Sequence, residues 1–439
     1  MQRRLSFDAS PPLNVPLRFM LTAPLFACLA GLMLLWAGPA ALVSRWNGTA
    51  LALTHIFVIG VLANVMAGAM LQILPVATGT HALATRTTAG VVHVLVSVGA
   101  LVLAAAFLFV MPHLFGVALA LLAVGLGWLG VAALGGIWQH RKQALPGSPT
   151  ILLAVRLSLV SLLATVLLGA ALAGSMAMAR PLPRTLTDLH ASWGLLGWVG
   201  LLIIGISFQV IPMFQVTERY PRHVTRWLAL SIFIVLGALT ANTLMPWAGQ
   251  YEATLLLGSA ALAGYLVYAA VTFDLLRGRK RDEPDTTTLF WRTALASLAL
   301  CVPAWLAHML GVANLSILLG VLFIVGFAWS AVNGMLYKIV PFLLWFNTQR
   351  DLEVALPIVP KVKHFMPDEV VRPQVWAHRA AVVLLSLAAM WPTAFTHAGA
   401  LALVVSTGWL MWHVWQALGL YRRAGREIAG ELERRATGS

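Results

Sequence analysis

Long apolar runs separated by short polar breaks are the dominant pattern along this chain. Splitting the runs at polar residues, prolines and glycines gives twelve stretches of about 20 residues, the length that crosses the hydrocarbon core of a bilayer. They begin near residues 17, 51, 88, 115, 151, 190, 227, 253, 289, 314, 375 and 398. The pattern therefore predicts an all-α membrane protein with twelve transmembrane helices.

One spacing of glycine, glutamine or lysine, and proline recurs three times, in the second, sixth and tenth stretches. The three copies are Gly60, Gly68, Gln72 and Pro75; Gly197, Gly205, Gln209 and Pro212; and Gly326, Gly334, Lys338 and Pro341. An arginine also lies near the start of the preceding first helix each time, at Arg18, Arg156 and Arg292. Internal repeats are a common way of building membrane proteins. We therefore expect one membrane domain over 1–439, built as a pseudo-threefold repeat of four-helix units at about 17–140, 150–277 and 288–422.

Composition and charge place the chain in a bilayer. Hydrophobic residues make up 60% of it and charged residues 10%, far fewer than the quarter usual in soluble domains. The net charge of +14 comes from short basic clusters in every second connection, which the positive-inside rule explains. We expect the lipid bilayer, not nucleic acid, to be the partner of these charges. The asymmetry predicts a multi-pass membrane protein with both termini in the cytoplasm. The first apolar run, from about Arg18 to Trp36, is long enough to span the membrane, so we expect no cleaved signal peptide.

The connection over 347–373 is the longest between predicted helices. It contains Pro357, Pro360 and Pro367 together with charges of both signs. Such a segment is typical of an irregular surface loop. We expect it on the cytoplasmic surface, where another membrane subunit or a redox partner would have access to it.

Carboxylates and cysteines offer little chemistry inside the predicted membrane region. All fifteen acidic residues lie in connections, tails or helix ends, so the sequence provides no buried carboxylate as a proton relay or hard-metal ligand. Cys28 and Cys301 lie in separate apolar runs without a CxxC spacing, which favours core packing. Histidine is left as the candidate ligand.

Five histidines are predicted at or near the outer membrane face: His55, His190, His308, His113 and His397. The first three are the candidate ligands. His55 and His190 belong to equivalent helices of two repeats, and neutral imidazole is a common ligand of haem iron and copper. The alternative for each is an interfacial, hydrogen-bonded histidine. We interpret His93, His378 and His413 as packing or loop-end residues.

Gln72, Gln209 and Lys338 occupy one equivalent position near the inner ends of the three repeated helices. Two interpretations remain open. They could line a polar cavity, or they could form hydrogen bonds between helices, with Lys338 extending to the headgroups.

The arrangement resembles subunit I of the haem-copper oxidase superfamily, which has twelve helices in three units and metal-binding histidines near helix ends. More closely, the run from His55 through Gly60, Gly68 and Pro75 to Gly79 is similar to the early signature helix of the NnrS family, haem- and copper-containing membrane proteins associated with nitric-oxide stress and denitrification. Arg18-Phe19 and Leu189-His190 carry the same resemblance in the first and sixth helices. It implies haem b, and copper as a second metal, bound through some of His55, His190 and His308.

The chain also departs from the oxidase pattern. The seventh and tenth helices, over 227–244 and 315–346, contain none of the histidines that an oxidase uses there, and Leu53 stands where NnrS-type helices often carry a second histidine. We therefore expect no conventional terminal oxidase or nitric-oxide reductase, and a non-respiratory role in nitric-oxide or metal and redox handling. The alternatives are a haem-free transporter and an accessory or structural subunit of a membrane redox complex.

Overall fold

The computed structural model describes residues 9–145, 148–182, 184–245, 247–348 and 357–437, and these residues form helices without any strand. Eleven helical stretches among them are long and apolar enough to cross a membrane. They are Asn14–Leu42 (α1, η2), Gly48–Thr78 (α2, η3, α3, η4), Thr85–Phe109 (α4), Pro112–Gln139 (α5), Pro149–Ala177 (α6), Arg184–Gln215 (α7, η6, α8), Arg222–Leu244 (α9), Gln250–Arg277 (α10), Thr286–Met309 (α11), Ser316–Asn347 (α12, η7, α13) and Pro392–Thr437 (α17). The prediction of an all-α membrane protein is confirmed.

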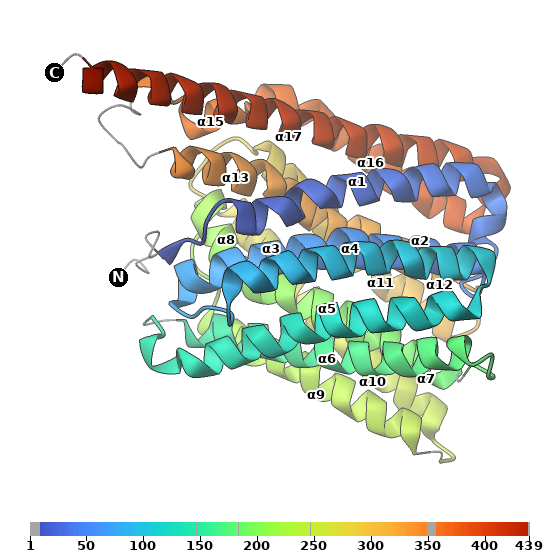
Figure 1. The fold of residues 1–439 in the computed structure, drawn as a ribbon. Coiled ribbons are helices and arrows are strands. Elements are labelled where there is room, and N and C mark those ends of the chain that lie inside the picture. Colours follow the sequence, from blue (N-terminus) through green and yellow to red (C-terminus); the bar gives the residue numbers. More distant parts are fainter. Residues whose placement is uncertain (1–8, 146–147, 183, 246, 349–356, 438–439) are drawn as a thin grey trace.

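The predicted eleventh membrane helix is α16, Asp368–Met390, and it is not among these eleven stretches. Its length of 23 residues is sufficient, but Gln374, His378 and Arg379 lower its hydropathy. It packs along α17, as Figure 1 shows. The remaining short elements are η5 (Arg141–Gln143) and α15 (Val362–Phe365).

Three stretches form the centre of the bundle, and they are the three that carry the repeated glycine pattern. In the most apolar part of Gly48–Thr78 and of Arg184–Gln215, 83% of residues are buried, and in Ser316–Asn347 the share is 72%. The other eight stretches bury 50% or less, because their outer faces are left for lipid. The repeated pattern thus identified the interior helices.

Each central stretch contains a π-helical segment around the first glycine of the pattern, in which the backbone hydrogen bonds span five residues instead of four, and Gly48–Thr78 has a second one, η4 (Leu74–Thr78), at its end. The segments around the first glycine are η3 (Ile56–Ala63), η6 (Trp193–Gly200) and η7 (Val321–Trp329). When the three stretches are aligned on the glycine pattern, these three segments coincide to within one residue. The segment η7 contacts both η3 and η6. Such segments are rare and are often found at functional sites.

The repeated glycines lie where the preceding helix crosses closely. A β-carbon on Gly68, Gly205 or Gly334 would lie only 2.7, 2.7 or 2.5 Å from a side-chain atom of Phe19, Ala154 or Phe290 in α1, α6 and α11. Packing of backbone against backbone therefore requires the small residue at each of the three positions.

These contacts also show how α1, α6 and α11 align with one another. This alignment corrects the predicted equivalence of Arg18, Arg156 and Arg292. Counted from Ala154 and Phe290, Arg156 and Arg292 occupy the same position, two residues further on. Arg18 precedes Phe19 by one residue, so it lies about one turn away from that position. Only two of the three arginines are therefore equivalent.

Several predicted boundaries were wrong. The sixth membrane stretch begins at Arg184 instead of near 190, so His190 lies within α7 (Arg184–Ser192). Pro212 and Pro341 lie inside α8 (Leu201–Gln215) and α13 (Ser330–Asn347). Membrane helices tolerate proline because neighbouring groups satisfy the freed carbonyls.

The last helix is longer than the predicted stretch of about 20 residues. The basic C-terminal tail is a continuation of α17, which runs for 46 residues. Within the predicted irregular connection over 347–373, residues 349–356 lie outside the described residues, while Phe365 and Met366 are buried and α16 begins at Asp368. The start of α1 and the end of α17 lie at the same end of the bundle (Figure 1).

Candidate functional site

His55 lies at the end of α2 (Gly48–His55), directly before η3. Asn47 caps the start of α2 by accepting a hydrogen bond from the backbone N–H of Thr49 at 3.0 Å. The Nδ1 atom of His55 lies 2.8 Å from the carbonyl oxygen of Leu51, one turn earlier. Phe107 of α4 stacks on the imidazole, with ring centres 5.2 Å apart and planes inclined by 26°. The ring is thus fixed in place from two sides.

His190 lies in α7, just before η6. Its Nδ1 atom lies 3.1 Å from the carbonyl oxygen of Thr165 in α6. Gly169, one turn further along α6, provides the space for the ring, because a β-carbon there would lie 2.9 Å from Cε1 of His190. The position of His190 therefore depends on the absence of a side chain at Gly169.

An ion pair at the surface joins the segments that carry the two histidines. Arg45 Nη1 lies 2.6 Å from Asp188 Oδ1, two residues before His190, and the guanidinium groups of Arg45 and Arg184 both lie over the ring of Trp46. Both members of the pair are largely exposed, so the pair itself contributes at most about 1 kcal/mol. Its role is to align α7 with the segment that precedes α2.

The structure brings His55 and His190 together. Their ring centres are 6.2 Å apart and the ring planes are inclined by 22°. Both side chains are half-buried, so part of each ring surface is accessible within an otherwise packed region. One histidine from each of two central membrane stretches thus forms the pair.

The hydrogen bonds fix which nitrogen of each ring is free to bind a ligand. A carbonyl oxygen can only accept, so in both neutral imidazoles Nδ1 carries the proton and Nε2 carries the lone pair. This is the pattern seen around histidines that bind metals, where a backbone carbonyl orients the ring through its second nitrogen. With ring centres 6.2 Å apart, the two imidazoles would be the residues that hold a metal atom here, through these nitrogens.

No group of three or more histidine, cysteine, aspartate or glutamate side chains is placed to hold one ion in the part of the chain that the structure describes. The histidine pair therefore provides two protein ligands. Two ligands suffice for haem iron, whose other four ligands come from the porphyrin.

His308, the third predicted ligand, is not brought into this pair. It lies at the end of α11, and its Nδ1 accepts a hydrogen bond from the backbone N–H of Leu315 at 3.3 Å. That bond links α11 to the start of the next membrane stretch. The geometry therefore gives His308 a place in a connection between helices, in contrast to His55 and His190.

No family model matches this chain, and the comparison with curated proteins finds no relative. The function is therefore inferred from the residues of this chain and their geometry.

The three equivalent polar residues of the repeats have separate partners. Gln72 Nε2 donates to Ser10 Oγ at 2.6 Å, and Lys338 Nζ lies 2.8 Å from Asp285 Oδ2. Lys338 therefore forms an ion pair with the residue that caps α11. Gln209 is buried. Whether the three line a cavity stays a prediction.

Asp285 caps the N-terminus of α11, accepting from the backbone N–H of Thr288 at 2.9 Å. Burial alone would raise the pKa of the Asp285 carboxyl. Lys338 and the hydrogen bonds from Thr288 outweigh that effect and hold the pKa below its usual range. The carboxylate is thus kept charged at neutral pH.

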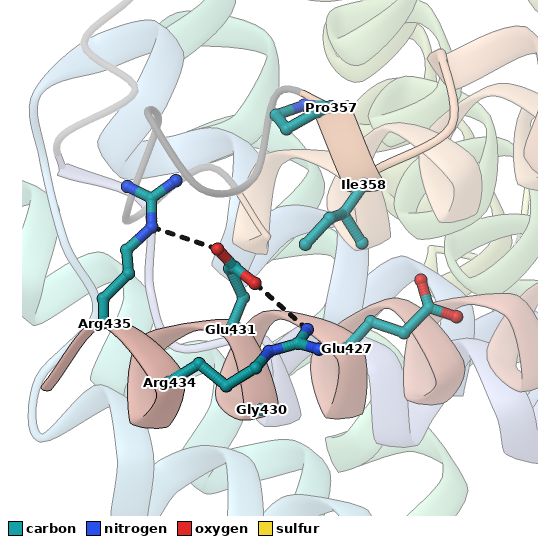
Figure 2. Close-up of a pocket in the computed structure, with 7 residues that line it drawn as sticks. All are labelled: Pro357, Ile358, Glu427, Gly430, Glu431, Arg434 and Arg435. Atoms are coloured by element: carbon teal, nitrogen blue, oxygen red, sulfur yellow. Dashed lines mark hydrogen bonds and ion pairs between the residues drawn. The ribbon is translucent and has the colours of Figure 1, made fainter. Parts of the chain in front are cut away.

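Two cavities lie at the ends of helices, away from the histidine pair. One of about 410 Å³ is lined by residues that include Pro75, His81 and Arg86. The other, of about 610 Å³, lies between the end of α17 and Pro357–Ile358. Figure 2 shows Glu431 there, paired with Arg434 at 3.0 Å and with Arg435 at 3.2 Å.

A group of buried polar side chains in the last four-helix region was missed by the sequence interpretation. His378 and His413, assigned to packing or loop ends, are both buried and hydrogen-bonded to residues of α13. The available signal was Ser330, Asn333 and Tyr337, three polar residues at helical spacing in an otherwise apolar run.

Proposed function

We propose that this chain is a bacterial inner-membrane protein that binds b-type haem through His55 and His190. The observation that carries the proposal is the pairing of the two imidazoles, 6.2 Å between ring centres, with each Nδ1 directed at a backbone carbonyl. The pair lies beside two of the three central π segments.

Haem held in this way supplies one-electron chemistry. The residues of the chain orient the ligands: Leu51 and Thr165 fix the tautomer of each imidazole, and Phe107 and Gly169 fix the ring positions. Among the described residues no aspartate or glutamate is fully buried, so none is placed inside the bundle to bring protons to the pair. These features favour electron transfer or ligand sensing over proton-coupled reduction.

The resemblance to the NnrS family and to oxidase subunit I gives the wider setting of the proposal. In that setting α16 also crosses the membrane, as the eleventh of twelve helices, and the chain is three four-helix units related by a pseudo-threefold axis. The coincidence of η3, η6 and η7 and the equivalent glycine contacts support that arrangement. The physiological role is then nitric-oxide protection or metal and redox handling, with copper as the alternative occupant of the pair.

The test is the reduced-minus-oxidised visible spectrum of the purified protein, made with ample haem, together with its iron and copper content. We expect sharp b-type bands that disappear in His55→Ala and in His190→Ala and persist in the matched control His308→Ala. If the folded wild-type protein is colourless and binds copper stoichiometrically, the histidine pair holds copper and not haem. A colourless protein without metal, or bands that survive both single substitutions, would refute the proposal.

A further inference from the structure

A buried polar face runs along α13. It consists of Ser330, Asn333 and Tyr337, whose side chains lie within one narrow sector of the helix because their spacing is three and four residues. All three are buried, with exposed fractions of 0%, 0% and 5%. In a membrane helix such residues are costly unless other groups satisfy them.

Helices α16 and α17 supply part of what this face requires. Ser330 Oγ lies 2.7 Å from His378 Nε2, and Tyr337 OH lies 3.0 Å from His413 Nδ1. One turn before His378 on α16, Gln374 Nε2 donates to the carbonyl oxygen of Ser406 at 2.9 Å. Two residues of the polar face thus contact histidines of the neighbouring helices, and Gln374 joins those two helices to each other.

Four polar atoms on α13 and α16 find no hydrogen-bond partner among the residues that the structure describes. They are both amide atoms of Asn333, Nδ1 of His378 and Oε1 of Gln374, and all three residues are completely buried. They include donors and acceptors. Buried polar atoms of this kind are nearly always satisfied, and ordered water with two to four polar partners is the usual solution.

We propose that water molecules bind among Asn333, Gln374 and His378 and complete a hydrogen-bonded path along α13 from His378 to His413. Ser330 joins the path at one end through His378, and Tyr337 joins it at the other through His413. Each imidazole has one ring nitrogen on a hydroxyl and a second nitrogen available for water.

The path leads towards one end of the bundle. His413 lies on α17, which continues past Tyr421 to the end at which α1 also begins (Figure 1). Near that end Asn347 Nδ2 donates to the hydroxyl of Tyr421 at 2.7 Å. The site is separate from the histidine pair of the proposed function and does not depend on it, since its residues come from α13, α16 and α17.

Arg379, the charged neighbour of His378, is held on the other side of α16. Its Nε donates to Thr293 Oγ1 at 2.9 Å and its Nη2 to the carbonyl oxygen of Leu289 at 3.1 Å, both in α11. The surroundings of His378 therefore contain neutral polar groups, which suits water and protons better than a charged solute.

The experiment measures the exchange of the histidine ring protons with solvent. Protein labelled with ¹⁵N only in histidine is placed in phosphatidylcholine and phosphatidylglycerol bilayers and moved into D₂O, and solid-state NMR follows the ring N–H of His378, assigned with His378→Gln. We expect this proton to exchange faster than the backbone amides of the surrounding α16 by roughly an order of magnitude or more. Tyr337→Phe should slow the exchange, because it removes the hydroxyl that meets His413. Tyr268→Phe, a buried tyrosine of α10, is the matched control and should leave it unchanged.

Two results would overturn the proposal. One is a His378 ring proton as protected as its helix backbone, which would mean that no water binds there. The other is an exchange rate that Tyr337→Phe leaves unaltered, which would exclude the route through His413. Asn333→Leu provides an independent check that does not depend on Tyr337: leucine at this position should displace the water and slow exchange, while the variant melts no lower than wild type. Unchanged exchange in a folded Asn333→Leu protein would also contradict the proposal.

Discussion

Replacing Gly169 by alanine tests the geometry of the histidine pair without touching a ligand. The added β-carbon would lie 2.9 Å from His190 Cε1 and 3.3 Å from Nδ1. Carbon atoms pack at about 3.5–4.0 Å, so the imidazole must move by roughly 0.6 Å or more. That movement strains the 3.1 Å hydrogen bond from Nδ1 to the Thr165 carbonyl, which fixes the tautomer of His190.

The expected loss is the one seen when groups that orient a metal ligand are altered, about 10- to 100-fold in affinity. This corresponds to about 1.4–2.8 kcal/mol of binding free energy. Folding should not suffer, because exchanging glycine for alanine inside a helix contributes up to about 1 kcal/mol of stability. Weakened binding in a protein of equal or higher melting temperature is thus the expected signature.

The assay is a titration of the haem-free protein with haem, followed by its visible spectrum, beside thermal melting of the same samples. Gly174→Ala is the matched control on the same helix, since its β-carbon would meet only Met178 Cε at 3.9 Å. It should bind haem as the wild type does. Equal affinity in Gly169→Ala and Gly174→Ala would refute the assignment of His190 as a ligand in this geometry.

Three further outcomes concern the rest of the fold. Asp285→Asn removes a carboxylate whose pKa is lowered by Lys338. The pair therefore stabilises the protein above the ordinary pKa of aspartate, and this stabilisation is lost as the pH falls through the lower, folded-state value. The variant should have a lower melting temperature than the wild type at pH 7, and the difference should vanish in acid. Gly200→Ala should destabilise the protein by on the order of 3 kcal/mol, because its methyl group would overlap the buried hydroxyl of Tyr265 and displace it from its carbonyl partner; chemical denaturation measures the change. Burial raises the pKa of Tyr220, between α8 and α9, to about 12. The protonated tyrosine therefore contributes fully to stability below about pH 10, and this contribution is lost as the pH rises through about 12. The melting temperature of Tyr220→Phe should fall less than that of the wild type over this pH range.

Each of these has a result that contradicts it. For Asp285→Asn it is a melting difference that persists unchanged below the ordinary pKa of aspartate. For Gly200→Ala it is a stability equal to that of Gly127→Ala, a helical glycine with no atom within 4 Å of its β-carbon. For Tyr220→Phe it is an alkaline melting profile identical to that of the wild type.

The repeated glycine spacing falls on the interior helices because close crossings between helices require a glycine at each of these positions. Gly68, Gly205 and Gly334 recur since three pairs of helices cross at the same place, and this crossing is readable as a spacing. His55 and His190 could be expected on one side of the membrane from their equivalent positions. The contact between the two rings could not be predicted, because it depends on how the two membrane stretches lie relative to each other in space.

Other features left no readable trace in the sequence. The π segments η3, η6 and η7 follow from tertiary packing, since no residue type in Ile56–Ala63 demands the extra residue. The pairing of Lys338 with Asp285 spans 53 positions and joins two elements whose separation the sequence does not give. By contrast, the helical tail had a signal that was overlooked: Glu431 and Arg435 stand four residues apart, as in exposed helices.

Because α17 is long, a small change in its tilt moves its C-terminal end by a large distance. At 1.5 Å per residue its 46 residues extend for about 69 Å, more than twice the thickness of the hydrocarbon core. If the helix pivots near Pro392, a change in tilt of 10° moves the tip at Thr437 by about 12 Å. His413 and Ser406, which contact α13 and α16, lie along the first half of this rod. A small repacking in the membrane interior would therefore appear as a large displacement of the arginine-rich tip, where a probe in the aqueous phase can record it.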